Sequence, residues 1–533
     1  MFFRYQRVSL HELFVPMIRC NRSRLVPYPA ALTRHLRARE SGTTMSATIL
    51  ELFPAPSPSP SKHTPTILPG ADADSTVALQ NVLRENHERW HIFFNDKRFH
   101  NHTTHHALAI WALGANKETI DAAYRKDAAM QKPAIPSPSP ITSVNFTSHL
   151  GDDKYFDAYM DFFKEKIQEK GTASVLEEFI FSEYANIDET VGKSKQPALL
   201  NRLMNGLVHP LIHTGYGLEF GLPGMVVEGL AQAAVHHDKL QPLFPSSFFT
   251  SSPAIDTLTE KTSSELALDE VPHAQTKKKG IHALDILARI LKDDTIEVPY
   301  NDEDAFTKTL EANGEALFRY ASQWTLDLSD PKEVNRKVEE LQWMNTIIYA
   351  IGGSQPGKKF NSNFFLMHLV TSSLFLPSFV AYLTPPSQAL LLRHYMAVSV
   401  AWWVSRGRPG FDIPKFFGAD TPLAPPTSPA TKTPSWKLTS THNPWFKIIQ
   451  HAVVHPDDHL CKIQRAFVHY ATLYGMRPSG EPEISRTELP GAEKLDGTLF
   501  LRAAYLTAKH FEPREGEKHG GENSFKWDRS GFY

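Results

Sequence analysis

Residues 77–94, VALQNVLRENHERWHIFF, and residues 105–130, HHALAIWALGANKETIDAAYRKDAAM, decide the fold class of this chain. In both stretches apolar residues recur at spacings of three and four, the period of a helix with one buried face. No comparable series of alternating apolar and polar residues, the pattern of strands, occurs anywhere in the 533 residues. The sequence therefore predicts an all-α protein, a large multi-helix, bundle-like globular fold with loop insertions.

Helical spacing of apolar residues continues along most of the chain. Gly171 stands where a helix commonly ends. The proline-rich segment 132–143 interrupts the pattern, and stretches 250–282 and 411–441 are predicted surface loops. No internal repeat is present, which argues against a solenoid. Further predicted helices lie in residues 154–171, 174–184, 200–220 and 225–237.

Residues 1–73 differ in composition from the rest of the chain. They are predicted to be a leader and a Pro/Ser-rich linker, disordered, ahead of one helical domain over 74–533. The first 44 residues are rich in arginine and poor in acids, as in a transit peptide. We favour a translation start at Met45. We therefore expect a cytoplasmic protein, or a mitochondrial one if residues 1–44 are a genuine transit segment.

Composition excludes several classes of function. The formal net charge is -2, so no basic surplus exists to bind nucleic acid. Cys20 and Cys461 are the only cysteines, which excludes a four-cysteine zinc site and a disulfide framework. Residues 360–392 carry no charge, but polar residues and prolines interrupt them, so they predict a buried helix pair around Pro385-Pro386 and no membrane span.

Histidine is the residue that points to chemistry, since the chain has 25. Side chains four residues apart lie on one face of a helix, and two imidazoles so placed can bind one metal ion. Most histidines on apolar helix faces are hydrogen-bonded core groups, but three such pairs favour a metal site. Which pairs converge stays open, and His100 and His105 compete with the first pair. The predicted metal ligands are His102 with His106, His209 with His213, and His455 with His459.

Three further residues are predicted to be catalytic. His368 lies in the most apolar helix, where a charged imidazolium is costly, so we expect it to be neutral. Glu219 is a carboxylate among apolar residues, which requires a cation, a metal or a hydrogen-bond donor nearby. Tyr216 belongs to the same segment and is a candidate wall of a flat pocket, together with aromatic residues Trp111, Phe364, Phe365 and Trp402.

Several charged residues allow a simpler interpretation. Glu228 either orients a metal-bound histidine or forms a salt bridge, with Arg465 or Lys462 as possible partners for it and for Glu219. Asp457 and Asp458 follow Pro456 and are predicted to begin a helix.

Nucleotide-binding motifs are not supported. Residues 347–360, IIYAIGGSQPGKKF, have the glycine spacing of a phosphate-binding loop, but Lys359 stands where the magnesium-binding Ser or Thr belongs. No G-x-G-x-x-G follows a predicted strand, and no G-x-S-x-G is present.

Several blocks of this sequence resemble the questin oxidase-like family of fungal polyketide gene clusters, in order and over about Leu79 to Tyr533. The blocks are FHNHTTHHALAIWALGA (99–115), HPLIHTGYGLEFGLPGMVVEGLAQAAVHH (209–237), FFLMHLVTSSLFLPSF (364–379), HPDDHLCKIQRAF (455–467), LPGAEKLDGTLFLRAAYLT (489–507) and KWDRSGFY (526–533).

The resemblance implies an oxygenase that opens an anthraquinone or a related aromatic polyketide by a Baeyer-Villiger-type oxidation using dioxygen and NADPH. Flavin enzymes of that type need dinucleotide-binding glycine motifs, which this chain lacks. We therefore expect non-haem iron bound by histidine, with NADPH reducing the quinone on a partner reductase. Lys462 is expected to form a salt bridge, since an ammonium group cannot ligate unless it is deprotonated or modified. The alternatives are a metal-free NADPH-dependent monooxygenase and a non-catalytic helical scaffold.

Overall fold

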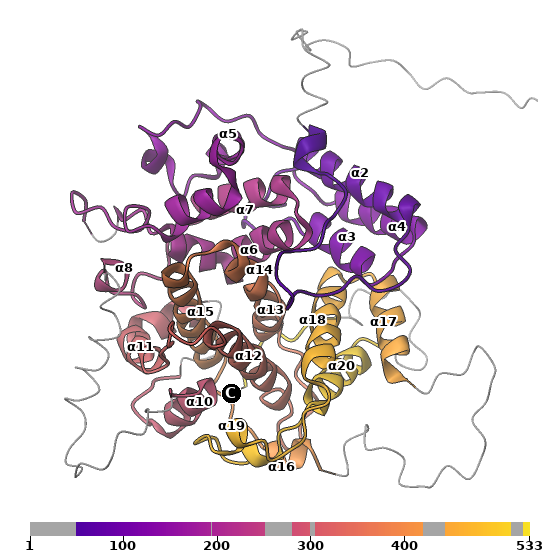
Figure 1. The fold of residues 1–533 in the computed structure, drawn as a ribbon, viewed down its shortest axis with the longest axis vertical. Coiled ribbons are helices and arrows are strands. Elements are labelled where there is room, and N and C mark those ends of the chain that lie inside the picture. The colour runs from indigo at the N-terminus through magenta and orange to yellow at the C-terminus, as the bar shows by residue number, and fades with distance from the viewer. Residues whose placement is uncertain are drawn as a thin grey trace, which may run out of the picture. The chain divides into compact units, whose positions relative to one another are not determined.

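The computed structural model describes residues 49–192, 195–250, 280–298, 304–418, 443–512 and 526–532, within a compact unit that spans Ala47–Tyr533 (Figure 1). These ranges contain helices and no β-strand, and only isolated bridges pair one backbone segment with another. The predicted all-α fold is confirmed. The arginine-rich segment, the Met45 start and most of the two predicted surface loops lie outside the described residues.

The first predicted helical stretches form α2 (Ala73–Arg89), α3 (Thr103–Ala112) and α4 (Lys117–Ala128). Asp72 and Ser75 form a reciprocal capping box that begins α2, and Asn116 caps α4 by accepting a hydrogen bond from the backbone N–H of Thr119. α3 is buried on every side and packs against α2, α4 and α18 (Asp458–Tyr474).

The next helices are α5 (Phe156–Leu176), the π-helix η3 (Glu177–Phe181), α6 (Leu199–Phe220) and α7 (Pro223–Val235). Gly171 leaves helical geometry with φ 80°, so α5 consists of two helices that meet at a kink there, and the first of them ends at Gly171 as predicted. α6 and α7 pack closely on each other. A Cβ at Gly229 would lie 2.6 Å from the backbone nitrogen of Thr214, so only glycine allows this approach.

The second half of the chain adds helices around α13, which packs against α6, α12, α15 and α18. Short 3₁₀ turns are η1 (Phe146–His149), η2 (Asp153–Tyr155) and η6 (Ala492–Lys494). The remaining elements are α8 (Ser247–Thr250), α10 (Ala283–Lys292), α11 (Ala305–Ser322), α12 (Glu333–Thr346), the π-helix η5 (Ile347–Ile351), α13 (Phe364–Ser373), α14 (Leu376–Tyr382), α15 (Pro385–Ser405), α16 (Ile413–Phe416), α17 (Pro444–Val454), α19 (Pro482–Ser485) and α20 (Thr498–His510).

The uncharged stretch 360–392 forms α13, α14 and the start of α15, which has Pro385 in its first turn. Most residues of α13 and of the first part of α14 are buried in the fold. Among the described residues no single helix has the length and apolar composition to cross a membrane. Only the pair α13 and α14, bent by 40°, meets both criteria together.

Part of the predicted leader packs on the helices. Phe53 is fully buried and would clash with any side chain at Gly224 of α7. The backbone N–H of Ser57 donates to Phe220, and that of Leu68 donates to Ala112. Parts of residues 49–73 therefore lie against α6, α7 and α3, with Leu52 and Phe53 buried in the core.

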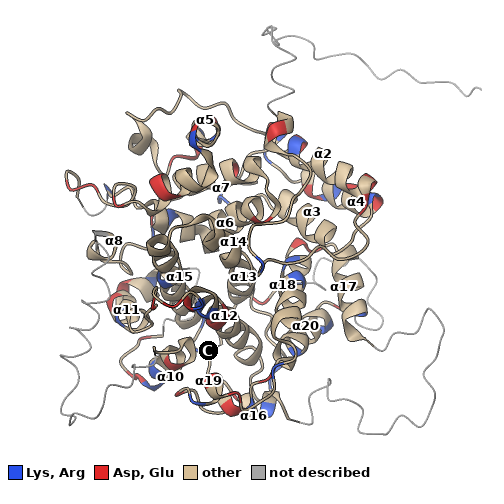
Figure 2. Ribbon diagram, in the orientation of Figure 1, with Lys and Arg blue, Asp and Glu red and all other residues tan. Residues whose placement is uncertain are grey.

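Charged residues lie on most helices, including α12 and α18 next to α13. Figure 2 shows Lys, Arg, Asp and Glu along α2, α4 and α5, whereas α13 and α14 carry none. The ionisable side chain that α13 brings into the interior is the imidazole of His368.

Candidate functional site

Four histidines from separate helical segments form a closed ring of imidazoles, the histidine tetrad: His102, His209, His368 and His459. Going round the ring, neighbouring centroids lie 4.8 Å apart (His102 to His209), 4.8 Å (His209 to His368), 5.2 Å (His368 to His459) and 4.7 Å (His459 to His102). Three of the side chains are buried, and His102 is 16 % exposed.

These spacings match four imidazoles around one metal ion. A ligating nitrogen lies about 2.1 Å from the ion and the ring centroid about 1.1 Å further out, so neighbouring centroids should be about 4.5 to 5.3 Å apart. All four measured distances fall in that interval. The spacing of the ring centroids is therefore that of a four-histidine metal site. Among the described residues, the groups whose ligand atoms all lie within 4.8 Å of one another are His100, His102 and His209, and His102, Asp458 and His459.

The Nδ1 atom of each tetrad ring lies beside an oxygen acceptor. His209 Nδ1 is 2.5 Å from the carbonyl oxygen of Gly206, and His368 Nδ1 is 2.7 Å from that of Phe364. The two carboxylate oxygens of Asp458 lie 2.8 Å from His102 Nδ1 and 3.2 Å from His459 Nδ1. An Nδ1–H donor to these oxygens leaves the lone pair on Nε2, the form of histidine that ligates a metal.

The Nε2 atoms of His102 and His209 lie 2.7 Å apart. If Nδ1 carries the proton in both rings, two lone pairs face each other, which is repulsive unless a proton lies between them. An ion bound to both nitrogens at about 2.1 Å would need them further apart. Among the described residues, the buried Nε2 atoms of His368 and His459 have no hydrogen-bond partner. These observations fit a donor set for a cation.

Burial keeps three of the tetrad imidazoles neutral. It is the largest influence that holds the pKa of His209 and His368 well below the usual 6.5, and it lowers the pKa of His102 to about 3. The neutral state expected for His368 agrees with this direction. Neutral imidazole is the metal-binding form.

A break in α6 places His209. Asn205 leaves helical geometry with ψ 178°, and Gly206, Leu207 and Val208 follow with φ between 55° and 58°. Left-handed backbone is costly for Leu and Val, and such strain is found most often at functional sites. A Cβ at Gly206 would lie 2.5 Å from Cε1 of His236, so the turn accepts only glycine.

Asp458 connects two tetrad residues to a buried lysine. Its Oδ2 atom also lies 2.9 Å from Nζ of Lys462, which is 3 % exposed. Burial alone raises the pKa of Asp458, but His459, Lys462 and His102 outweigh it and hold that pKa well below its usual range. The predicted salt bridge of Lys462 is thus present. Asp457 caps α18 as predicted, whereas sequence reasoning missed that Asp458 contacts the tetrad.

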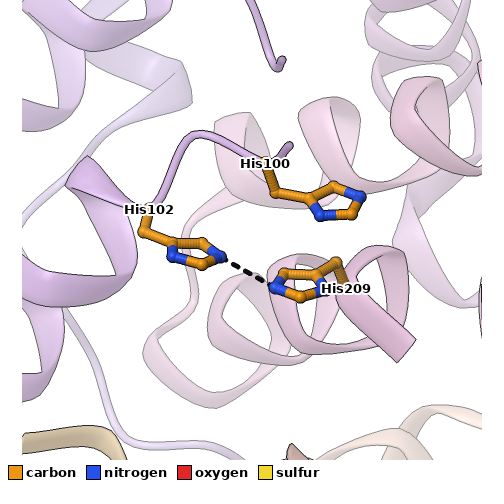
Figure 3. A group of neighbouring side chains, drawn as sticks. All are labelled: His100, His102 and His209. Atoms are coloured by element: carbon orange, nitrogen blue, oxygen red, sulfur yellow. Dashed lines mark hydrogen bonds between the residues drawn. The ribbon is translucent and has the colours of Figure 1, made fainter. Parts of the chain in front are cut away.

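His100 lies behind His209. Their rings are stacked, with centroids 3.9 Å apart and planes 8° apart, whereas His102 meets His209 edge to edge (Figure 3). A ligated imidazole lies in a plane that contains the ion, so two rings in separate parallel planes cannot both bind it well. Although nitrogens of His100, His102 and His209 lie within 4.8 Å of one another, Nε2 of His100 pairs with Nε2 of His236 at 2.8 Å.

The structure does not bring the other predicted ligands to the tetrad. His106 faces α4, where its Nδ1 lies 2.7 Å from Asp127. His455 is the C-cap of α17, outside α18, and its ring packs against Phe511. His213 does lie one turn after His209 in α6, but it faces α7.

His213 belongs to a chain of hydrogen bonds that leads toward the surface. His105 Nε2 lies 2.9 Å from His213 Nδ1, and His213 Nε2 lies 2.7 Å from Oε2 of Glu228. The other oxygen of Glu228 is 2.7 Å from Nδ1 of His87, a half-buried residue. Glu228 therefore orients a histidine, but His213 lies outside the tetrad, so this is not the metal-bound histidine of the prediction.

Tyr216 and Glu219 form a separate buried group. Glu219 makes an ion pair with Arg465, one of its predicted partners. Burial raises the pKa of Glu219 while Arg465 lowers it, and burial raises the pKa of Tyr216 well above its usual range. The Tyr216 ring stacks on His105 with centroids 5.1 Å apart, and His105 in turn stacks on the tetrad residue His102 with centroids 5.7 Å apart.

Aromatic rings border one side of the tetrad. The Phe364 ring centroid lies 4.7 Å from that of His368 and 5.1 Å from that of His459. Phe365 and Trp402 stack with centroids 5.4 Å apart. Trp111, also predicted to line the pocket, packs elsewhere, against Phe220.

A small cavity lies beside Arg465, lined by Leu68, Leu113 and His469 among others. Its volume of about 20 Å³ suits a single water molecule and is too small for a polycyclic substrate.

The fold and the site define the class of this protein: it is all-helical and has a buried four-histidine centre. The family model for questin oxidase-like proteins matches residues 99–467, which contain the whole tetrad. The chain belongs to the questin oxidase-like family, as the sequence predicted.

Relatives agree with this assignment. The chain is 26% identical over 480 residues to Baeyer-Villiger monooxygenase AacuH of Aspergillus aculeatus, covering 86% of this chain and 89% of the relative. It is 26% identical to questin oxidase of Aspergillus terreus over 397 residues, covering 73% and 79%. It is 25% identical to Baeyer-Villiger oxidase ptaJ of Pestalotiopsis fici over 448 residues, covering 81% and 87%. The protein is an oxidoreductase.

Proposed function

We propose that this protein catalyses the oxygen-dependent, Baeyer-Villiger-type oxidation and ring opening of an anthraquinone or a related aromatic polyketide, with non-haem iron held by the histidine tetrad. The closed ring of four imidazoles carries the proposal, because its spacings suit one ion. The names of relatives such as questin oxidase supply the substrate class.

The chemistry of the donors favours a redox metal. Imidazole nitrogen suits iron, copper, nickel and zinc, but zinc has no redox chemistry. An iron ion bound there would supply the electron transfer that lets dioxygen react with an electron-rich hydroquinone. His102, His209, His368 and His459 would hold it.

The residues around the tetrad have defined tasks in this proposal. Asp458 fixes the orientation of His102 by accepting from its Nδ1–H, and the ion pair with Lys462 compensates its charge in a buried place. The half-buried Phe364 ring packs against His368 and His459 and limits the access of water to the tetrad.

NADPH has a subordinate role in this scheme. Reduction of a quinone to a hydroquinone consumes the hydride of NADPH and makes the ring electron-rich enough for oxidation. We propose that this step takes place on a partner reductase. The hydroquinone and dioxygen would then react with each other at the tetrad.

The test is the metal content of the protein after anaerobic purification and reconstitution with ferrous iron. We expect close to one equivalent of iron, and oxygen uptake with a chemically reduced anthraquinone. His209→Ala should lose both. His63→Ala should lose neither, because His63 is exposed and its hydrogen bonds to Ser61 and His469 run through its backbone. Less than about a tenth of an equivalent of any metal would contradict the proposal. Turnover that needs NADPH but no metal would instead support the metal-free monooxygenase.

A further inference from the structure

The C-terminal strap, residues 526–532, joins the starts of two helices that carry tetrad histidines. Toward α13 its contacts are mostly backbone ones. Phe364 N–H donates to the carbonyl of Asp528 at 2.7 Å, and Asp528 N–H donates to the carbonyl of Ser362 at 3.0 Å. The Asp528 carboxylate accepts from the Ser362 N–H at 2.8 Å, and Asn363 Nδ2 donates to the carbonyl of Ser530 at 2.9 Å.

Toward α18 the strap uses the indole of Trp527, which is 7 % exposed. Its Nε1–H donates to Oδ1 of Asp457 at 3.0 Å. The same oxygen caps α18 by accepting from the backbone N–H groups of His459, at 2.9 Å, and Leu460, at 3.1 Å. Trp527 is anchored in turn by Phe511, with ring centroids 4.7 Å apart.

Both attachment points lie close to tetrad residues. Asn363 is the N-cap of α13, and His368 follows a little more than one turn later. Asp457 is the N-cap of α18, and His459 is two residues further on. The strap also places the Arg529 guanidinium over the Phe364 ring, 4.5 Å from its centroid, and that ring touches both histidines.

We propose that the strap is a clamp that fixes the separation of His368 and His459, with Trp527 and Asp528 as positioning residues. This inference rests on the proposed function, because it assigns the strap to the same metal centre. α13 and α18 also pack on each other directly, so the fold does not depend on the strap alone. The strap instead sets the last few tenths of an ångström between two ligands, to which metal affinity is sensitive.

Cobalt(II) binding to the full-length protein tests the clamp, followed by titration and by the visible spectrum of the bound ion. Trp527→Phe keeps the aromatic contact with Phe511 and removes the N–H donor, and Asp528→Ala removes the acceptor for Ser362. We expect each to weaken cobalt affinity by about tenfold and to alter the spectrum, as loss of groups that orient ligands does. Trp90→Phe is the matched control, because it also removes one indole hydrogen bond, to Tyr124, and should bind like wild type.

The outcomes separate the two proposals. Suppose that the wild type binds about one equivalent of cobalt, and that Trp527→Phe and Asp528→Ala bind it with the same affinity and the same spectrum. This result would overturn the clamp but not the proposed metal site in the tetrad. The clamp is also overturned if Trp527→Phe and Trp90→Phe show the same fall in melting temperature and the same weakening of cobalt binding. A wild type that binds no metal overturns both proposals.

Discussion

His213 and Glu228 form a buried pair between α6 and α7, with Nε2 of the imidazole 2.7 Å from Oε2 of the carboxylate. Both side chains are almost fully buried, at 1 % and 3 % exposure. The second oxygen of Glu228 pairs with His87 in the same way. One carboxylate thus ties α2, α6 and α7 together.

The acid stability of the protein should depend on Glu228. Burial alone raises its pKa, but the hydrogen bonds from His213 and His87 outweigh this and lower the pKa to about 2, against 4.5 in the unfolded chain. A depressed pKa stabilises the fold above pH 4.5, and that contribution disappears as pH falls toward 2. We expect Glu228→Gln to lower the free energy of unfolding by roughly 3 kcal/mol at neutral pH.

Urea unfolding from pH 7 to pH 3 measures this effect. The difference between wild type and Glu228→Gln should shrink as pH drops below 4.5. Glu85→Gln, which removes an exposed pair with Arg89, is the control and should change little at any pH. A pH-independent difference would show that the lost contribution is packing.

The left-handed turn before His209 predicts that Gly206 does not tolerate substitution. Gly206→Ala should cost about 1–2 kcal/mol for the backbone alone, with a further cost because the new methyl group overlaps the ring of His236. Gly480→Ala isolates the first contribution, since Gly480 has φ 79° and nothing lies within 4 Å of its Cβ position. Thermal and urea unfolding should rank Gly206→Ala clearly below Gly480→Ala. Equal losses would mean that His236 moves aside freely.

A buried lysine gives an independent prediction about the core. Lys337, 2 % exposed, pairs with Glu340 at 3.0 Å, and Glu340 also accepts from the indole of Trp324. Lys337→Met leaves this carboxylate without its cation, which should cost about 3–5 kcal/mol. Lys117→Met breaks a pair with Asp121 at the surface and should cost less than about 1 kcal/mol. Chemical denaturation of both variants tests the contrast, and similar losses would contradict it.

Helical periodicity was enough to predict the fold class, because most of the apolar residues that recur at spacings of three and four are the ones buried between helices. The packed segment 49–73 escaped prediction. Its composition is polar and proline-rich, so the apolar pair Leu52 and Phe53 gave no clear signal, and Phe53 fits against α7 because residue 224 there is a glycine.

The histidine pairs were predictable only in part, since the four-residue rule assumes that both members lie in one helix. His102 is the N-cap of α3, and His455 is the C-cap of α17, so two of the three pairs break this assumption. His368 has no histidine four residues away in either direction, and its tetrad neighbours come from segments far along the chain. Tertiary packing alone brings it to the tetrad.

His102 and His106 allow the sequence-based pairing to be tested against the geometry. Both were predicted to bind the same metal, yet His102 belongs to the tetrad and His106 pairs with Asp127. His102→Ala should therefore reduce bound iron from about one equivalent to below about a tenth. His106→Ala should keep the iron and instead lose stability, by about 3 kcal/mol, because it removes the buried partner of the Asp127 carboxylate and leaves only Lys126, 3.9 Å away. Elemental analysis and thermal unfolding of the two variants distinguish these effects, and loss of iron from His106→Ala with its retention in His102→Ala would place the metal on the other face of α3.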